Sequence, residues 1–142
     1  MKGSEPAGAG LSKADYAAIS AFRHQLRRFL AFSETAAGEA GLPPQQHQAL
    51  LALAGWDGPA TVGVLAEQLL IAPHTAAELV MRMVEADLVA KAPSAQDRRR
   101  VELALTVKAR AILEGLTAAH LEELRTLEPA LVKALRGLNR GR

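Results

Sequence analysis

Residues 94–106 read Ser-Ala-Gln-Asp-Arg-Arg-Arg-Val-Glu-Leu-Ala-Leu-Thr, and this stretch decides the fold. Residues 101–105 alternate the large apolar side chains of Val101, Leu103 and Leu105 with Glu102 and the small Ala104, as a half-buried strand does. A second short segment with strand character covers 88–91, and the loop between the two segments holds three consecutive arginines. We therefore expect a β-hairpin whose exposed loop, residues 92–100, carries a cluster of positive charge.

The residues before this hairpin have the pattern of a helix-turn-helix. Thr61 is a suitable N-cap for a short helix through Leu69, and only residues 70–72 separate that helix from the next. Pro73 stands where a first helical residue belongs, and the second helix continues to about Ala86. Two short helices followed by a hairpin predict a winged helix-turn-helix, which places its second helix in a DNA groove.

Helical segments flank this central part. From 11 to 39, apolar residues recur every three or four positions, as on one buried helix face. Gly41 ends that helix, and Pro43 and Pro44 begin another that runs to about Ala54. With few aromatic residues and few β-branched runs, the chain is expected to be mainly α, with the hairpin as its only sheet.

A long helical region follows the hairpin, with Thr106 as its cap. Pro129 predicts a break near Thr126 to Glu128 and a separate last helix from Pro129 to about Leu138, because proline interrupts helical hydrogen bonding. The region has more apolar surface than a small domain can cover, which favours a homodimer formed through the N- and C-terminal helices. The leucines that suggest this surface are Leu113, Leu116, Leu124, Leu127, Leu131 and Leu135.

Length and composition indicate one globular domain. The 142 residues are 49% apolar, which is enough for a single core. We expect a flexible tail at 1–10 and one domain over 11–142, with dimerisation helices at about 11–40 and 106–138 around a winged helix-turn-helix at about 43–105. The net charge of +2 is too small to indicate nucleic acid by itself, so the clustering of cations carries that interpretation.

Several classes of protein are disfavoured. The chain has no cysteine, which excludes disulfides, thiolate metal sites and thiol redox sensing. The first ten residues lack the apolar run of a signal peptide and no later stretch resembles a membrane span, so we expect a cytoplasmic protein without membrane contact. His120 and Glu123 are one helical turn apart, but a single such pair is more often solvated than metal-bound. No catalytic motif is present, so we expect no enzyme, no metal and no cofactor.

The three arginines of the loop, Arg98, Arg99 and Arg100, are candidates for DNA contact. A run of charge is usually just solvated, but the position of this one beside a helix-turn-helix favours phosphate or minor-groove contact. Arg100 adjoins the second strand, and the alternative is that it only supports this strand.

The second helix of the helix-turn-helix supplies the other candidates. His74 and Thr75 occupy its first turn, where side chains meet base edges or phosphates, although helix capping would also explain them. Arg82 is suited either to a phosphate contact or to a bridge to Asp97. Glu78 repels phosphate unless it accepts a hydrogen bond from a cytosine amine or pairs with an arginine.

The order and spacing of these elements resemble the MarR family of winged-helix transcriptional regulators. The resemblance extends over about residues 14–138, and the Asp-Arg-Arg of the loop followed by Leu-x-Leu-Thr is its most specific part. The matching motifs are Gly41-Leu42-Pro43-Pro44-Gln45-Gln46-His47, Leu65-Ala66-Glu67-Gln68-Leu69, Leu79-Val80-Met81-Arg82-Met83, Asp97-Arg98-Arg99 and Leu103-Ala104-Leu105-Thr106.

The resemblance implies a mainly α homodimer that reads a pseudo-palindromic double-stranded DNA operator with two winged domains. Arg99 matches the family's minor-groove arginine, and His74, Thr75 and Ala77 match helix positions that often face DNA. The chain departs from the family at Asp87, where a glycine is usual, and at Ala72, which replaces a serine N-cap. Aspartate tolerates the left-handed conformation that such a position requires, so the fold is still expected.

Many relatives release DNA when a small aromatic acid or phenol binds between the dimer helices and the winged domain. The resemblance thus implies a ligand-responsive repressor whose effector is a small aromatic or anionic molecule. The alternative is that these residues are simply core, since aromatic residues at helical spacing usually are. A winged helix that binds only another protein is the alternative function. The candidate effector residues are Tyr16, Phe22, Arg23, Arg27, Phe29, His47 and Leu50.

Overall fold

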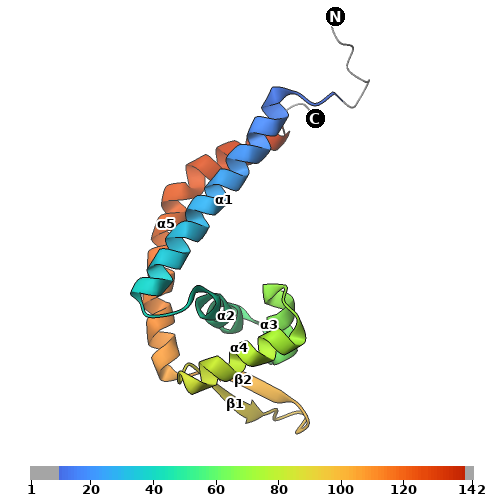
Figure 1. Ribbon diagram of the computed structural model, residues 1–142, viewed down its shortest axis with the longest axis vertical. Coiled ribbons are helices and arrows are strands. Elements are labelled where there is room, and N and C mark those ends of the chain that lie inside the picture. The colour runs from blue at the N-terminus through green and yellow to red at the C-terminus, as the bar shows by residue number, and fades with distance from the viewer. Residues whose placement is uncertain (1–9, 140–142) are drawn as a thin grey trace, which may run out of the picture. The chain divides into compact units, whose positions relative to one another are not determined.

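The computed structural model describes residues 10–139, which form five helices and one two-stranded sheet within that range (Figure 1). Its order of elements agrees with the mainly α, winged-helix fold predicted from the sequence. The elements are α1 (Lys13–Glu39), α2 (Pro44–Gly55), α3 (Val62–Leu69), α4 (Pro73–Glu85), β1 (Val89–Pro93), β2 (Val101–Leu105) and α5 (Val107–Asn139).

The chain divides into two compact units. Residues 34–119 form one, which we call the winged unit because it contains the helix-turn-helix and the hairpin. Residues up to Ser33 and from His120 onward form the other, which we call the terminal unit. Both long helices, α1 and α5, contribute to both units.

The winged unit is built around a core of aliphatic side chains. Leu50 of α2, Leu65 of α3 and Val80 of α4 are completely buried, and Leu103 of β2 closes the core from the side of the hairpin. Burying a leucine or valine side chain contributes about 1.5–3 kcal/mol each, so this core holds the three helices and the hairpin in fixed relation.

The helix-turn-helix begins and turns where the sequence predicts. The hydroxyl oxygen of Thr61 accepts a hydrogen bond from the amide of Val64 at 3.2 Å, as an N-cap does. Leu70 ends α3 in the left-handed conformation, with a φ of 57°. The residue is 91% exposed. Pro73 is the first residue of α4 and is preceded by Ala72, whose side chain offers no cap.

The hairpin pairs Val89 with Leu105 and Pro93 with Val101 in antiparallel register. β1 extends two residues further than the predicted segment 88–91, which shortens the loop to residues 94–100. The amide of Leu103 also donates to the carbonyl oxygen of Ala60 at 2.8 Å, on the segment before α3. The hairpin is thereby attached directly to the start of the helix-turn-helix.

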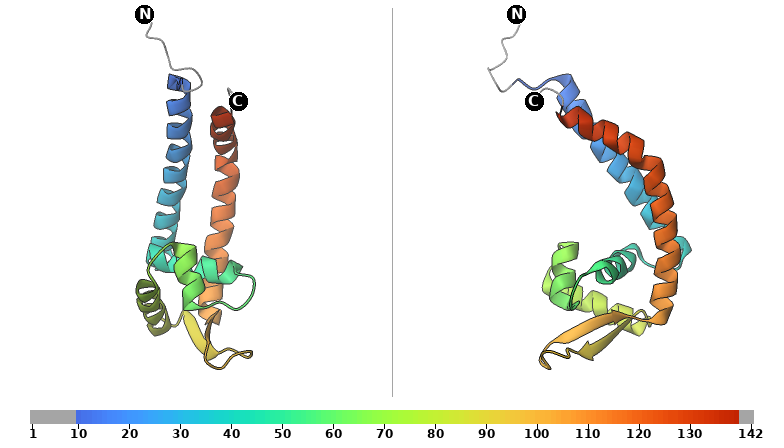
Figure 2. Two further views of the ribbon diagram at one scale, coloured as in Figure 1. Left: turned by 90° about the vertical axis from the view of Figure 1, so that its right-hand side faces the viewer. Right: turned by 180° about the vertical axis from the view of Figure 1, so that it is seen from behind.

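In the terminal unit, α1 and the C-terminal part of α5 run antiparallel, side by side (Figure 2). The Nε2 atom of His120 lies 2.8 Å from the hydroxyl oxygen of Ser33 near one end of the pair. Near the other end, a Cβ atom added to Gly137 would lie 3.3 Å from the Cβ of Ala18, so the two backbones approach closely there.

The break predicted at Pro129 is wrong, because α5 continues through this proline to Asn139. Proline inside a helix costs about 3 kcal/mol through a lost hydrogen bond and a clash with the carbonyl one turn earlier. Apolar side chains on both sides of Pro129, including the buried Leu127 and Ala134, pack within the terminal unit only if the helix is maintained. Their burial offsets the cost of the proline.

The predicted leucine surface of α5 is also partly wrong. Leu113, Leu116 and Leu127 are buried within the chain itself, together with His120. A second apolar stripe is left exposed, and it includes Leu121, which the prediction did not contain, with Leu124 and Leu135. Both stripes repeat every three or four residues, so periodicity alone does not tell which one the chain covers.

Candidate nucleic-acid interface

The loop of the hairpin, residues 94–100, is ordered by its own hydrogen bonds. The buried hydroxyl oxygen of Ser94 accepts from the amides of Gln96 and Asp97 at 3.2 and 3.3 Å. The Oδ1 atom of Asp97 accepts from the amide of Arg99 at 3.0 Å. The Ser94 amide donates to the Arg100 carbonyl at 2.9 Å and closes the loop. These are the serine and aspartate turns that fix a loop without a hydrophobic core.

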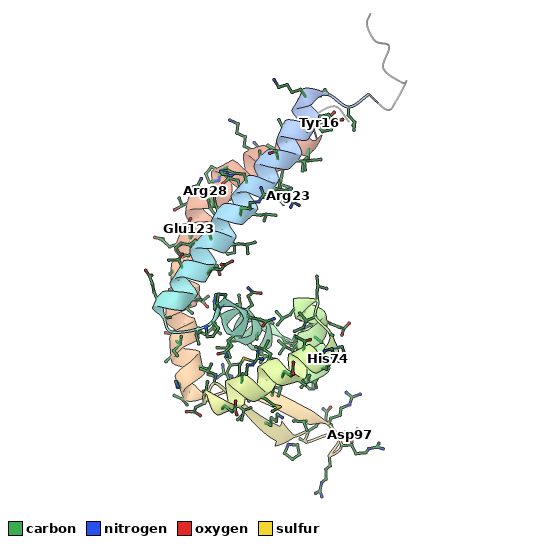
Figure 3. All side chains as sticks on the ribbon, in the orientation of Figure 1. Tyr16, Arg23, Arg28, His74, Asp97 and Glu123 are labelled. Carbon is green, nitrogen blue, oxygen red and sulfur yellow. The ribbon has the colours of Figure 1, made fainter. Side chains whose placement is uncertain are left out.

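The ordered loop presents its arginine side chains to solvent. Arg98, Arg99 and Arg100 are all exposed, and the Arg99 side chain is 92% accessible. Asp97 lies at this tip in Figure 3, and its Oδ1 atom is 3.5 Å from the Nε of Arg99. Asp97 is therefore paired with its neighbour on the loop, and the predicted alternative of a bridge to Arg82 is not formed.

Helix α4 has one buried and one exposed face. Ala76, Leu79, Val80 and Met83 point into the core. Of the predicted contact residues, Thr75 is half-buried, whereas the other three are exposed, and His74 lies near the start of the helix in Figure 3. The exposed predicted residues are His74, Ala77 and Arg82.

The end of α4 is held by the start of α5. Asp87 adopts a φ of 59°, the left-handed conformation expected of a residue that stands in place of glycine. Its carbonyl oxygen accepts from the hydroxyl of Thr106 at 2.7 Å, and the Ala86 carbonyl accepts from the Nζ of Lys108 at 3.0 Å. An ammonium group at a helix C-terminus also interacts favourably with the helix dipole.

Charge is distributed unevenly over the winged unit. Residues 34–119 contain seven Lys and Arg against ten Asp and Glu, a net charge of −3. Three of the seven cations are the arginines of the loop. A polyanion would therefore meet its main attraction at the hairpin loop and repulsion over much of the remaining surface.

The predicted effector residues lie on two different units. Tyr16, Arg23 and Arg27 are exposed on α1 of the terminal unit, where Phe22 is half-buried. Phe29 is half-buried there and meets the ring of His120 edge-on at 5.7 Å between ring centroids. His47 and Leu50 belong to α2 of the winged unit, where both are buried.

His120 has a packing role in the terminal unit. Its ring stands between Phe29 and Phe32 in edge-to-face geometry and is bonded to Ser33. Over residues 10–139, no three His, Asp or Glu side chains gather in a group that could hold a metal ion. In the same range no helix has the length and apolar character needed to cross a membrane.

Ser94, which organises the loop but carries no charge, was not among the residues predicted for the site. Its signal was available in the run Ser-Ala-Gln-Asp, because serine and aspartate readily accept bonds from amides two or three residues ahead. Lys108 was not predicted either, and its contact with Ala86 joins residues 22 positions apart. Such a long-range contact depends on the tertiary fold.

Comparison with solved structures shows where this arrangement occurs. A MarR family protein from Bacillus stearothermophilus is 23% identical, with a TM-score of 0.73, over 92% of this chain and 97% of the other. RV1404 from Mycobacterium tuberculosis is 25% identical, with a TM-score of 0.71, over 96% and 98%. The model of the MarR family matches residues 40–100. This chain therefore has the fold of the MarR family proteins over most of its length, and its central part matches the model of that family.

A further MarR-like structure includes nucleic acid. It is a mutant of MepR from Staphylococcus aureus bound to an oligodeoxyribonucleotide, 22% identical with a TM-score of 0.63, over 80% of this chain and 82% of the other. Comparison with curated proteins finds no match. This chain therefore shares its fold with a protein whose structure has been determined with bound DNA.

Proposed function

We propose that the protein is a homodimeric transcriptional regulator that binds a pseudo-palindromic double-stranded DNA operator. The observation that carries this proposal is the loop of residues 94–100. Its backbone is fixed by Ser94 and Asp97, and its arginine side chains are exposed on a unit that is otherwise acidic. Cations concentrated on one protruding loop suit a phosphate backbone or a narrow minor groove.

Each element has a separate role in this proposal. Arg98 and Arg99 enter or border the minor groove, and the backbone of Arg100 closes the loop that holds them. Helix α4 lies in the adjacent major groove, with His74, Ala77 and the hydroxyl of Thr75 near base edges or phosphates. Arg82, exposed and one turn from the end of α4, contacts a phosphate.

The terminal unit supports the proposed dimer. Its exposed large apolar side chains come from both helices, with Ile19, Leu26 and Leu30 on α1 and Leu121 and Leu135 on α5. A hollow of about 320 Å³ lies along α5 in the same unit. Exposed apolar surface of this extent favours a partner, and an isologous interface with a second copy requires no other protein. Leu121, Leu124, Arg125, Glu128, Leu131 and Val132 line the hollow.

We further propose that the regulator is a repressor released by a small aromatic or anionic ligand. A ligand lowers DNA affinity only if it binds better to the state that does not hold DNA, so binding alone is insufficient evidence. Linkage requires the operator to weaken the ligand by the same factor. Trp56, the single tryptophan of the chain, lies in the winged unit and provides a fluorescence signal for titrations with and without operator.

Selection from a random DNA library tests the DNA-binding proposal directly. A regulator of this kind enriches an inverted repeat whose half-sites are about one helical turn, roughly 10 bp, apart. Its affinity for that repeat falls steeply with salt as counterions are released. A winged helix that binds only protein would enrich no sequence, and its weak retention of DNA would be the same for every duplex.

A further inference from the structure

Glu78 stands on the exposed face of α4, one helical turn after His74 and one turn before Arg82. The N-terminal half of a recognition helix is the part that meets base edges. A carboxylate in that position repels every phosphate near it, so it lowers the affinity of the helix for DNA of any sequence. For α4 to bind DNA, the Glu78 carboxylate must either make a contact that compensates for this repulsion or face away from the DNA.

The chain itself does not neutralise this carboxylate. In the range 10–139 the ion pairs are those of Arg99 with Asp97 and of Arg125 with Glu122. Glu78 takes part in neither, although Arg82 is four residues further along the same helix, at the spacing that normally favours a pair. The carboxylate is thus unpaired and exposed, and both of its oxygens can accept hydrogen bonds from a ligand.

We infer that Glu78 selects cytosine in each half-site by accepting a hydrogen bond from the exocyclic N4 amine in the major groove. This inference rests on the proposed function. Cytosine presents only a donor at that edge, whereas guanine presents two acceptors and thymine one acceptor and a methyl group. Adenine presents a donor beside the N7 acceptor, which repels a carboxylate. Of the four bases, cytosine therefore matches an acceptor-only side chain best.

Any base that His74 contacts belongs to a different base pair from the one that Glu78 contacts, if α4 runs along the groove. Four residues along an α-helix correspond to about 6 Å, and successive base pairs are separated by about 3.4 Å. The two side chains thus reach positions roughly two base pairs apart. The acidic surface of the winged unit adds to this selectivity, because it disfavours duplexes that offer only phosphates.

The glutamine variant makes the inference testable, because glutamine has nearly the same shape and pairs with the N6 and N7 atoms of adenine. Binding-site selection with full-length Glu78→Gln protein should convert one cytosine of each half-site to adenine. The ratio of affinities for the cytosine and adenine duplexes should change by about tenfold or more. Glu85→Gln is the matched control, since Glu85 is exposed at the end of α4 and its variant loses the same charge.

The outcomes separate this inference from the proposed function. If Glu78→Gln strengthens binding to all duplexes as Glu85→Gln does, with no change in the selected base, Glu78 is only a repulsive charge and the inference is overturned. The proposed function then still holds, provided that the unmodified protein enriches an inverted repeat and loses affinity on Arg99→Ala. If the unmodified protein enriches nothing, both are overturned.

Discussion

The hydroxyl of Thr106 donates to the carbonyl oxygen of Asp87 at 2.7 Å and also accepts from the amide of Ala109 at 3.1 Å. One side chain thus caps the start of α5 and bonds to Asp87, two residues after the end of α4. Lys108 adds a second bond to the end of α4, through the Ala86 carbonyl. The position of the candidate recognition helix is therefore linked to α5 by hydrogen bonds as well as by the core.

Replacing Thr106 by valine should destabilise the protein by about 1–2 kcal/mol, because both the cap and the bond to Asp87 are lost. Urea denaturation followed by circular dichroism measures this loss. Serine at the same position keeps the hydroxyl and should restore most of the stability. A valine variant as stable as the original protein would show that these two bonds contribute no net stability.

Arg99→Ala should weaken operator binding and leave the free energy of unfolding unchanged, because an exposed cation contributes little to stability but helps to neutralise phosphate. The slope of log affinity against log salt should fall by about 1. Arg110→Ala, which removes an exposed cation from α5 of the winged unit, is the control. Equal affinity losses in both variants would point to net charge instead of a contact at the loop.

Ser94→Ala should reduce operator affinity although Ser94 itself touches no DNA in the proposed arrangement. The loop loses two hydrogen bonds. The variant loop must therefore lose conformational entropy when it binds DNA, whereas the original loop is already ordered in the free protein. Fluorescence anisotropy with labelled operator measures the effect, and Ser94→Thr should largely restore affinity. If the alanine variant binds as tightly as the original, the hydrogen bonds of Ser94 are unnecessary for presenting the arginines.

Leu121→Lys should dissociate the proposed dimer at micromolar concentration, because it places a charge on the exposed apolar surface proposed as the interface. Light scattering after size-exclusion chromatography gives the mass directly. Leu70→Lys is the matched control, since Leu70 is a 91% exposed leucine of the winged unit. A Leu121→Lys variant that keeps the dimer mass would place the interface elsewhere.

An aromatic acid such as benzoate or salicylate, titrated against the operator complex, should lower operator affinity if the repressor proposal is correct. Trp56 fluorescence gives the ligand affinity with and without operator, and anisotropy of labelled operator gives the DNA affinity at each ligand concentration. The factor by which the ligand lowers operator affinity must equal the factor by which the operator lowers ligand affinity. A set of aromatic acids that bind without changing operator affinity would remove the ligand response from the proposed function.

The ends of the short helices were predictable because local chemistry determines them. Thr61 caps α3 and Pro73 starts α4 whatever surrounds them, and the strand alternation of residues 101–105 is equally local. The leucines of α5 were less predictable, because Leu121 and Leu127 have the same character and differ only in which side the rest of the chain covers. Which leucine is covered therefore depends on the tertiary packing and not on the local sequence.

The residues proposed for the interface stay a prediction, and the structure adds their exposure and their arrangement. The arginines of the loop and His74 follow from the order of elements, and they are exposed as a contact surface requires. The pairing of Asp97 with Arg99 instead of Arg82 could not be predicted, because both partners are within reach in sequence terms and loop geometry decides between them. The hydrogen bonds of Ser94, in contrast, are local, and the sequence Ser-Ala-Gln-Asp was sufficient to suggest them.

Pro129 has a consequence for the lifetimes of the hydrogen bonds along α5. Because proline has no amide proton, the carbonyl of Arg125 lacks its usual partner one turn ahead, and the helix is linked across this point by one bond fewer. The turns after Pro129 can therefore open while those before it stay closed. Amide protons of residues 130–138 should exchange with deuterium before those of residues 113–127. Pro129 thus leaves α5 continuous, but the hydrogen bonds after it open faster than those before it.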